Sequence, residues 1–472
     1  MKILLINPPC GDHTIGLKNI AKIEPLNLEL LGAMVGDRHE VRLVDMEVAP
    51  RDLDSMLREF IPDIVGVTSE VVHVETAKRA LARARLAAPR CVTVVGGHHP
   101  TVWPQDFLDP VIDLVVRGEG TEAFRDICDT VADGGRTFHH IDGLMIREGD
   151  ALTPTKPRPL PRTLDHQPMP DRSLTARYRH KYFYLWERRI AAVRSSVGCS
   201  FPCIFCSCRV YSHGGFIPRS PELLLEEIAG LEEEFVYLCD DHAFHDPERM
   251  WKLGEMLLSA GIKKRYFTYA RVDSIVENRE LFALWARAGL QLVMSGLESL
   301  DYEALKRTGK RVEKGRDEEA LAILDDLGIG MSAGFLVEPH FEEKDFLAID
   351  DYVKRHPAIL LTEFTPLTPL PGTPLYRKVE PDLVSTDRQL YDLQHFLLPT
   401  ETPPKQLYQL MRQAYARVIR RAALKLGLWR PGNWSWHYIR MFVGLMRNYK
   451  ALKEAHLHIP QPEPKPELED VG

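Results

Sequence analysis

Two successive series of short β-branched runs, each followed by a helical pattern, constrain the fold of this chain more than any other feature. In the first, residues 1–150, the runs are KILLINPP, EVRLVD, DIVGVTS, CVTVVGG and DLVVRGEG, with helical periodicity around 26–35, 53–60 and 75–86. Strands that alternate with helices form parallel sheets with helices on both faces. We therefore predict an α/β fold that begins with a doubly wound parallel sheet.

The second series covers residues 186–400 and has six strand-like runs with helices between them. This pattern predicts a partial (β/α)6 barrel, whose reactive groups lie at the carboxyl ends of the strands. Residues 151–185 are rich in Pro and Arg and have no sustained period, so we predict a linker there. At 472 residues the chain is long enough for two separate cores.

The region after the barrel differs from the rest of the chain in charge. Residues 401–458 have a helical pattern, and between Lys405 and Lys453 there are eleven Lys or Arg residues and no Asp or Glu. Residues 459–472 are rich in Pro and Glu, which predicts a disordered tail. The formal net charge of -7 argues against nucleic acid as a partner. The chain has no signal-peptide pattern and no long apolar stretch, so we expect a cytoplasmic protein.

Four of the eight cysteines lie between residues 199 and 208, which suggests a metal site. The spacing Cys199-x3-Cys203-x2-Cys206 follows the first predicted barrel strand, so the three thiolates should share one loop. Three Cys ligands leave one iron of a [4Fe–4S] cluster open to another ligand. A closed zinc site needs a fourth donor, which Cys208 or His213 could supply, and zinc remains the alternative. The other four cysteines are predicted to be small buried hydrophobes: Cys10, Cys91, Cys128 and Cys239.

The pattern Cys-x3-Cys-x-aromatic-Cys, with Phe205 as the aromatic, resembles the radical S-adenosylmethionine (SAM) superfamily over residues 186–400. The resemblance implies a [4Fe–4S] cluster held by Cys199, Cys203 and Cys206. It also implies that SAM binds the open iron and that a reductase, ferredoxin or flavodoxin supplies electrons.

Two further segments bear on how SAM would be held. MSGLES resembles the fourth-strand segment in which a Ser and a Glu approach SAM, which implies this role for Ser295 and Glu298. Where many members have Gly-Gly-Glu, this chain has CDDHAF, so Asp240 and Asp241 are either groups near the substrate or a helix-capping pair. Arg271 is a candidate for a carboxylate or ribose contact, or an ordinary ion-pair partner.

A doubly wound domain before a radical SAM barrel resembles the cobalamin-binding class of the superfamily, and VVGGHHPT and VVRGEG resemble its loops. The resemblance implies that methylcobalamin lies against Gly96, Gly97, Gly118 and Gly120, where glycine lets the backbone approach a large flat ligand. NAD is not expected, because GxGxxG is absent after the first strand. The Asp-x-His-x-x-Gly motif for cobalt has only a partial counterpart, around His13.

Within this class the chain most resembles the hopanoid C-methylases, nearly end to end. The segments that carry the resemblance are DDHAF, IKKRYFTYARVDSIVENRELFALWARAGL, MSGLES and YDLQHFLLPTETP. The resemblance implies transfer of a methyl group to an unactivated carbon of a hopanoid, a hydrophobic polycyclic lipid, with C-3 preferred over C-2. The alternatives are an oxidative cyclase or natural-product C-methylase of the same class, and a non-catalytic zinc or cobalamin sensor.

The C-terminal segments LYQLMRQAYARVIRRAALKLGLW and WSWHYIRMFVGLMRNYKALK combine apolar faces with basic ones. This combination is typical of helices that lie on an anionic membrane surface, and it predicts peripheral contact at the inner face of the membrane. The alternative is a pair of helices that cover the barrel and keep a solvated basic face.

Overall fold

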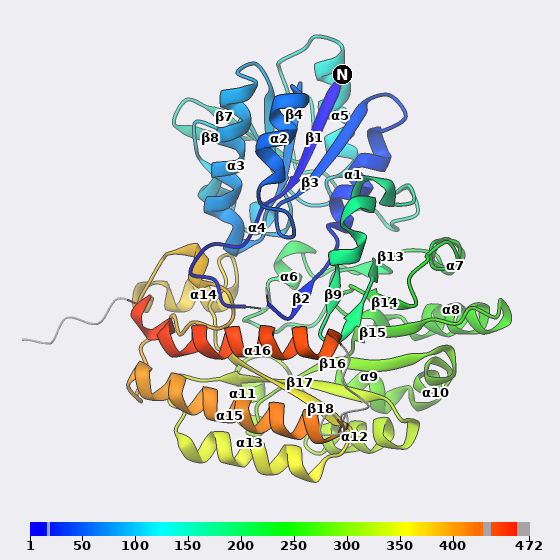
Figure 1. Cartoon of the computed structure of the whole chain (residues 1–472), viewed down its shortest axis with the longest axis vertical. Helices are drawn as coiled ribbons and strands as arrows, with labels where there is room; N and C mark the ends of the chain where they lie inside the picture. The colour runs from blue at the N-terminus through cyan, green and yellow to red at the C-terminus, as the bar shows by residue number, and fades with distance from the viewer. Residues whose placement is uncertain (17–18, 426, 428–435, 460–472) are drawn as a thin grey trace, which may run out of the picture.

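The computed structural model describes residues 1–16, 19–425, 427 and 436–459, and it places two parallel sheets one above the other along the long axis (Figure 1). The predicted disordered tail, 459–472, lies outside the described residues apart from Ile459. The first sheet belongs to the N-terminal region and the second to the barrel. The predicted order of the two α/β regions is therefore confirmed.

The N-terminal sheet has seven strands in the order β3-β1-β4-β5-β6-β7-β8, of which the first five are parallel. Helices α1 and α5 pack on one face and α2 and α3 on the other, so the sheet is doubly wound as predicted. The strands are β1 (Lys2–Asn7), β3 (Glu40–Asp45), β4 (Ile64–Thr68), β5 (Val92–Gly96), β6 (Leu114–Val116), β7 (Leu144–Glu148) and β8 (Ala151–Pro154). The helices are α1 (Leu26–Val35), α2 (Asp52–Glu59), α3 (Val74–Ala87), α4 (His98–Val102) and α5 (Thr121–Ala132).

Strand β8 lies in the stretch that was predicted as linker. It is an exposed edge strand without apolar alternation, which is why its sequence gave no strand signal. The chain then crosses to the barrel through a 3-10 helix, η3 (Arg172–Lys181), which packs against β3. A small antiparallel sheet follows, made of β2 (Ala21–Lys22), β9 (Phe183–Tyr184) and β10 (Glu187–Arg188).

The barrel contains six parallel strands in sequence order, β11-β14-β15-β16-β17-β18, which confirms the partial (β/α)6 barrel. The strands are β11 (Ile190–Val193), β14 (Phe235–Leu238), β15 (Arg265–Tyr269), β16 (Leu290–Glu298), β17 (Gly330–Val337) and β18 (Ile359–Pro366). The helices of this region are α7 (Pro221–Ala229), α8 (Pro247–Ser259), α9 (Val272–Glu277), α10 (Arg279–Ala288), α11 (Tyr302–Arg307), α12 (Arg316–Leu327), α13 (Glu343–Arg355) and α14 (Pro374–Val379).

The two faces of the barrel sheet have different side chains. Val236, Val293 and Phe335 belong to the core that the strands share with the helices. On the opposite face, Tyr237 and Phe267 stack with Tyr184 of β9, with ring centroids 4.6 to 6.3 Å apart. The barrel interior therefore has an aromatic wall.

Two long helices follow the barrel. Helix α15 (Pro404–Lys425) packs on β18 and α13, and α16 (Trp436–Glu454) packs beside α15 (Figure 1). Helix α16 also reaches the N-terminal loop, where the Asn448 amide donates to the Gly16 carbonyl oxygen at 3.0 Å. At Gly444 an added Cβ would lie 2.2 Å from the carbonyl oxygen of Asn19. Within the described part of the chain, no helix has an apolar stretch that would reach across a bilayer.

A buried ion-pair network joins the two regions around Arg172. Its guanidinium donates to Glu227 of α7 at 2.6 Å and to the Ala192 carbonyl oxygen of β11 at 2.8 Å. It also pairs with Glu24, and lies 3.6 Å from Glu29 of α1. Burial raises the pKa of Glu29 to about 7, against the opposing effect of the Arg172 charge. One guanidinium therefore compensates carboxylates from both sides of the interface.

We expect Arg172→Met to lower the free energy of unfolding by about 3 to 5 kcal/mol, because the buried Glu29 loses its cation, whereas Glu24 and Glu227 keep Arg179 and Arg219. Urea unfolding followed by circular dichroism measures this loss. Arg279→Met is the matched control, since Arg279 pairs with Asp326 at 3.3 Å on the surface and such pairs contribute less than about 1 kcal/mol. Equal effects of the two substitutions would contradict a bridging role for Arg172.

Candidate cluster and cofactor site

The three predicted cluster cysteines lie on one loop after β12 (Ser196–Val197), with Cys203 buried and Cys199 and Cys206 half-buried. The loop begins at Gly198, whose φ of +94° is a conformation that side-chain-bearing residues rarely adopt. An added Cβ at Gly198 would also lie 2.3 Å from the Gly215 carbonyl oxygen. Glycine is thus required where the chain turns into the cluster loop.

Asp240 and Asp241, which follow β14, hold the start of this loop. The buried Asp240 carboxylate accepts hydrogen bonds from the backbone N–H of Ser195 at 2.8 Å and of Ser196 at 2.6 Å. Asp241 accepts from the backbone N–H of Gly198 at 2.8 Å. The helix-capping interpretation is wrong for this pair, because the next α-helix, α8, is capped by Asp246.

The far part of the loop is fixed by the barrel. The Ile204 backbone N–H donates to the Thr308 carbonyl oxygen at 2.9 Å, and the Ile204 carbonyl oxygen accepts from the Leu375 N–H at 3.0 Å. The Arg271 guanidinium lies 3.7 Å from the centroid of the Phe201 ring. Arg271 is itself bound by Asp273 and by a backbone carbonyl, so its donors serve an ion pair within the protein.

Electrostatic effects on the three thiols differ. Burial raises the pKa of Cys199 and Cys203, although the Arg271 charge opposes this shift at both positions and Lys310 opposes it at Cys203. A hydrogen bond from the Cys208 thiol lowers the pKa of Cys206 to about 7. Cationic side chains therefore stand next to the thiols, as suits an anionic cluster.

The spacing of the thiols bears on the zinc alternative. A single tetrahedral zinc with Zn–S bonds of about 2.3 Å brings its sulfur ligands to about 3.8 Å from one another. Among the described residues, the cluster-loop cysteines do not form a group whose donor atoms all lie within 4.8 Å. The sulfur atoms of these cysteines are therefore too widely spaced, as a set, for one zinc ion, and they fit the corners of a multi-iron cluster better.

Ser295 and Glu298, the two residues predicted to approach SAM, differ in their surroundings. Glu298 lies at a bulge in β16 with φ +65°, and its carboxylate accepts from the buried Lys310 ammonium at 3.0 Å. Ser295 lies on the same side of the strand as Val293 and Leu297, whose side chains face the helices, and its buried Oγ has no hydrogen-bond partner among the described residues. The contacts of Ser295 and Glu298 with SAM stay predictions. The orientation of the Ser295 side chain, toward the helices, does not favour a contact with SAM.

The four predicted cofactor glycines lie together at the carboxyl edge of the N-terminal sheet. Gly96 ends β5 and Gly97 precedes α4, while Gly118 and Gly120 lie between β6 and α5. At Gly118 the φ is +82°, and no atom of the described residues lies within 4 Å of an added Cβ. Gly118 lines a cavity of about 370 Å³ that reaches His213 beyond the cluster loop.

The glycine loops and the cluster loop meet through Tyr211, at the end of α6 (Cys208–Tyr211). The Tyr211 ring stacks on His98 with centroids 5.3 Å apart, and its hydroxyl donates to the Gly118 carbonyl oxygen at 3.4 Å. The weak cobalt candidate His13 lies elsewhere, stacked on His458 of the C-terminal region at 4.6 Å. The site is therefore built from the facing ends of the two sheets.

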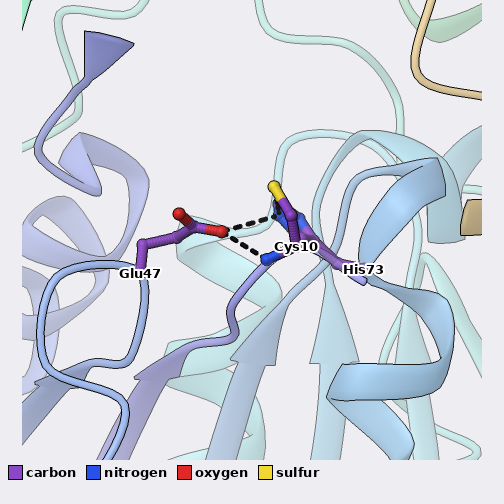
Figure 2. A group of neighbouring side chains, drawn as sticks. All are labelled: Cys10, Glu47 and His73. Atoms are coloured by element: carbon purple, nitrogen blue, oxygen red, sulfur yellow. Dashed lines mark hydrogen bonds and ion pairs between the residues drawn. The ribbon is translucent and has the colours of Figure 1, made fainter. Parts of the chain in front are cut away.

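One polar group of the N-terminal sheet was missed from the sequence. Cys10, Glu47 and His73 converge at the carboxyl ends of three strands (Figure 2). The predicted burial is correct for Cys91 and Cys128 but wrong for Cys10 and Cys239, which are half-buried, and Cys10 lies among polar groups. No signal in the sequence links these three residues, because the sheet topology alone brings them together.

Comparisons with known proteins agree with this architecture. Residues 13–128 match the B12 binding domain, and residues 193–353 match the Radical SAM superfamily. The chain is 29% identical over 418 residues to a hopanoid C-3 methylase of Methylococcus capsulatus, covering 86% of this chain and 78% of the relative. It is 26% identical to an anaerobic magnesium-protoporphyrin IX monomethyl ester cyclase of Cereibacter sphaeroides, covering 91% and 72%.

Solved structures share the fold over nearly the whole chain. The cobalamin-dependent SAM radical enzyme OxsB, with aqua-cobalamin and SAM bound, matches with a TM-score of 0.67 and 17% identity, covering 97% of this chain and 80% of that one. The radical SAM methyltransferase TsrM from Kitasatospora setae, with cobalamin and a [4Fe-4S] cluster bound, matches with a TM-score of 0.69 and 15% identity, covering 96% and 99%.

These matches identify the class as an enzyme that joins a cobalamin-binding domain to a radical SAM barrel. The chain therefore carries the two domains of the cobalamin-binding radical SAM methyltransferases, in the same order. The cofactors of this class are a [4Fe–4S] cluster, SAM and cobalamin. The spaced cysteine thiols and the open space at Gly118 fit the first and the last of these.

We expect Gly198→Ala to lower the iron content from about four per chain to below about one, because the Cβ displaces the loop that carries the three ligands. Iron analysis after anaerobic reconstitution measures this change. Gly261→Ala is the control, because Gly261 has φ +65° but open space around an added Cβ. Full iron content in the Gly198 variant would refute the requirement.

Proposed function

We propose that this protein is a radical SAM, cobalamin-dependent C-methyltransferase that adds a methyl group to an unactivated carbon of a hopanoid lipid, with C-3 preferred over C-2. The observation that carries the proposal is the meeting of the cluster loop and the glycine loops at Tyr211, beside an aromatic-walled barrel. The similarity to a hopanoid C-3 methylase over 86% of the chain supports the substrate class.

The residues of the chain would act by holding and orienting. Cys199, Cys203 and Cys206 would hold the cluster, and the glycine loops would hold cobalamin. When bound, these cofactors supply a radical that removes a hydrogen atom from carbon and a methyl group that replaces it. Tyr237, the half-buried ring of the stack with Tyr184 and Phe267, would give a polycyclic hydrocarbon an apolar surface, and the buried rings behind it would help to exclude water from reactive species.

A second candidate is another reaction of the same class, either oxidative cyclisation or methylation of a natural-product intermediate. The similarity to an anaerobic magnesium-protoporphyrin IX monomethyl ester cyclase, at 26% identity over 91% of the chain, supports this second candidate. Both candidates use the same two cofactors, so only the product distinguishes them.

Expression of the chain in a host that makes unmethylated hopanoids tests the proposal. We expect a hopanoid that is heavier by one CH2, with the methyl group on ring A at C-3, detected by gas chromatography and mass spectrometry. Cys203→Ala serves as the inactive control, since it removes a proposed cluster ligand. A protein loaded with cluster and cobalamin that leaves the hopanoids unchanged would exclude this substrate.

We also propose that the enzyme reaches its lipid by peripheral contact with an anionic membrane through α16. Ile439, Phe442, Val443 and Met446 are exposed at successive turns of one face, and the Phe442 side chain is 54% exposed. Arg447, Lys450 and Lys453 stand on the same helix, also exposed. An apolar stripe with basic neighbours is suited to the headgroup region of anionic lipids.

Helix α15 fits the alternative of a barrel-covering helix. Leu407, Tyr408 and Met411 are buried in the barrel core. Arg421 donates to Asp350 of α13 at 2.6 Å, and Arg417 lies 3.6 Å from the same carboxylate. These two arginines are therefore ion-paired within the protein, and the outer face of α16 is the surface to test.

We expect the double variant Phe442→Glu, Met446→Glu to bind phosphatidylglycerol-containing vesicles at least about tenfold more weakly, because burying one such side chain contributes about 1.5 to 3 kcal/mol. Vesicle sedimentation measures the partition. Leu347→Glu, at an apolar residue of α13 that is 44% exposed, is the control. Partition that is the same for all three proteins would refute the contact, and dimerisation through this face would appear in gel filtration.

A further inference from the structure

A second set of side chains with metal-ligand chemistry lies away from the cluster loop. Cys10 follows β1, Glu47 follows β3, and His73 ends the 3-10 helix η1 (Val71–His73) that follows β4. The strand order β3-β1-β4 makes these three strands neighbours, so their carboxyl ends bring the side chains together (Figure 2). Doubly wound sheets bind ligands at the carboxyl ends of their strands, at the point where the chain switches from one side of the first strand to the other.

The distances between the donor atoms fit one cation. Cys10 Sγ lies 3.5 Å from His73 Nε2, and His73 Nε2 lies 3.7 Å from Glu47 Oε1. All three donor atoms lie within 4.8 Å of one another, and the described residues contain no other such group of His, Cys, Asp or Glu side chains. Tetrahedral zinc with bonds of about 2.0 to 2.3 Å separates its donor atoms by about 3.3 to 3.6 Å.

Glu47 is a carboxylate even without a bound cation. Burial opposes ionisation of Glu47, but the hydrogen bond from His73 and the Lys22 ammonium hold its pKa well below the ordinary value. Lys22 pairs with Oε2, so Oε1 is the oxygen that faces Cys10 and His73. The His73 and Glu47 side chains are only 13% and 14% exposed, which shields a bound ion from bulk water.

We propose that Cys10, Glu47 and His73 form a second metal site, which binds a zinc-class divalent cation through Sγ, Oε1 and Nε2 and leaves the fourth position open. Thiolate, imidazole and carboxylate are the donors that zinc takes in sites of this kind. The site needs neither the cluster nor a lipid substrate, so it goes beyond the proposed function. A bound cation would join the loops after β1, β3 and β4 at the edge where the cofactor domain faces the barrel.

Binding changes the protonation of two ligands. The Cys10 thiol loses its proton to solvent as the thiolate binds the cation. In the metal-free protein the Glu70 backbone N–H donates to His73 Nδ1 at 3.3 Å, which places the imidazole hydrogen on Nε2. Coordination through Nε2 moves this hydrogen to Nδ1, which gives up the long contact with Glu70 but releases no proton. Zinc binding becomes tighter as the pH rises because the Cys10 thiol releases its proton.

The test uses the full chain after its cluster and cobalamin are loaded, so that the cluster cysteines are occupied. The protein is equilibrated with zinc, passed through gel filtration and analysed for zinc, iron and cobalt. We expect about one zinc per chain. Zinc-edge X-ray absorption should show one sulfur at about 2.3 Å and N or O ligands at about 2.0 Å.

Cys10→Ala and His73→Ala should each weaken zinc binding at least tenfold while iron and cobalamin contents stay unchanged, which shows that the variants are folded. His139→Ala, at a histidine of the same domain whose side chain is 55% exposed, should bind zinc normally. Absence of zinc from the wild-type protein would overturn the proposal. Equal zinc content in all variants, or an absorption edge without sulfur, would overturn it as well.

Discussion

The buried contacts of Arg172 set the position of one sheet relative to the other, and the site depends on that position. Glu24 and Glu29 stand on the cofactor-domain side of the guanidinium, and Glu227 and the end of β11 on the other. A charge in a medium of low polarity tolerates little displacement from its partners. Because β11 leads directly into the cluster loop, the same interaction that joins the domains also sets where the cluster lies against the glycine loops.

Sequence patterns predicted the features that depend only on residues close together in the chain. The β-branched runs predicted both parallel sheets, and the Cys199, Cys203 and Cys206 spacing placed three thiols on one loop, as the structure has them. The edge strand β8 escaped prediction because an exposed strand needs no apolar alternation.

Contacts between distant segments could not be predicted. The role of Asp240 and Asp241 depends on β14 lying beside β11, which only the barrel register provides. The pairing of Arg421 with Asp350 likewise depends on α15 crossing α13. Cys10 gave no signal beyond that of an ordinary small hydrophobe, since its partners lie 37 and 63 residues away along the chain.

The contact between Gly444 and Asn19 has a consequence for how α16 can move. With the helix backbone this close to a carbonyl oxygen, and Asn448 bonded one turn further on, a rotation of α16 about its own axis would break both contacts. The apolar stripe of α16 therefore keeps one orientation relative to the barrel. A flat surface that settles on this stripe would meet the enzyme in a single pose, so docking would also set the direction from which a lipid enters.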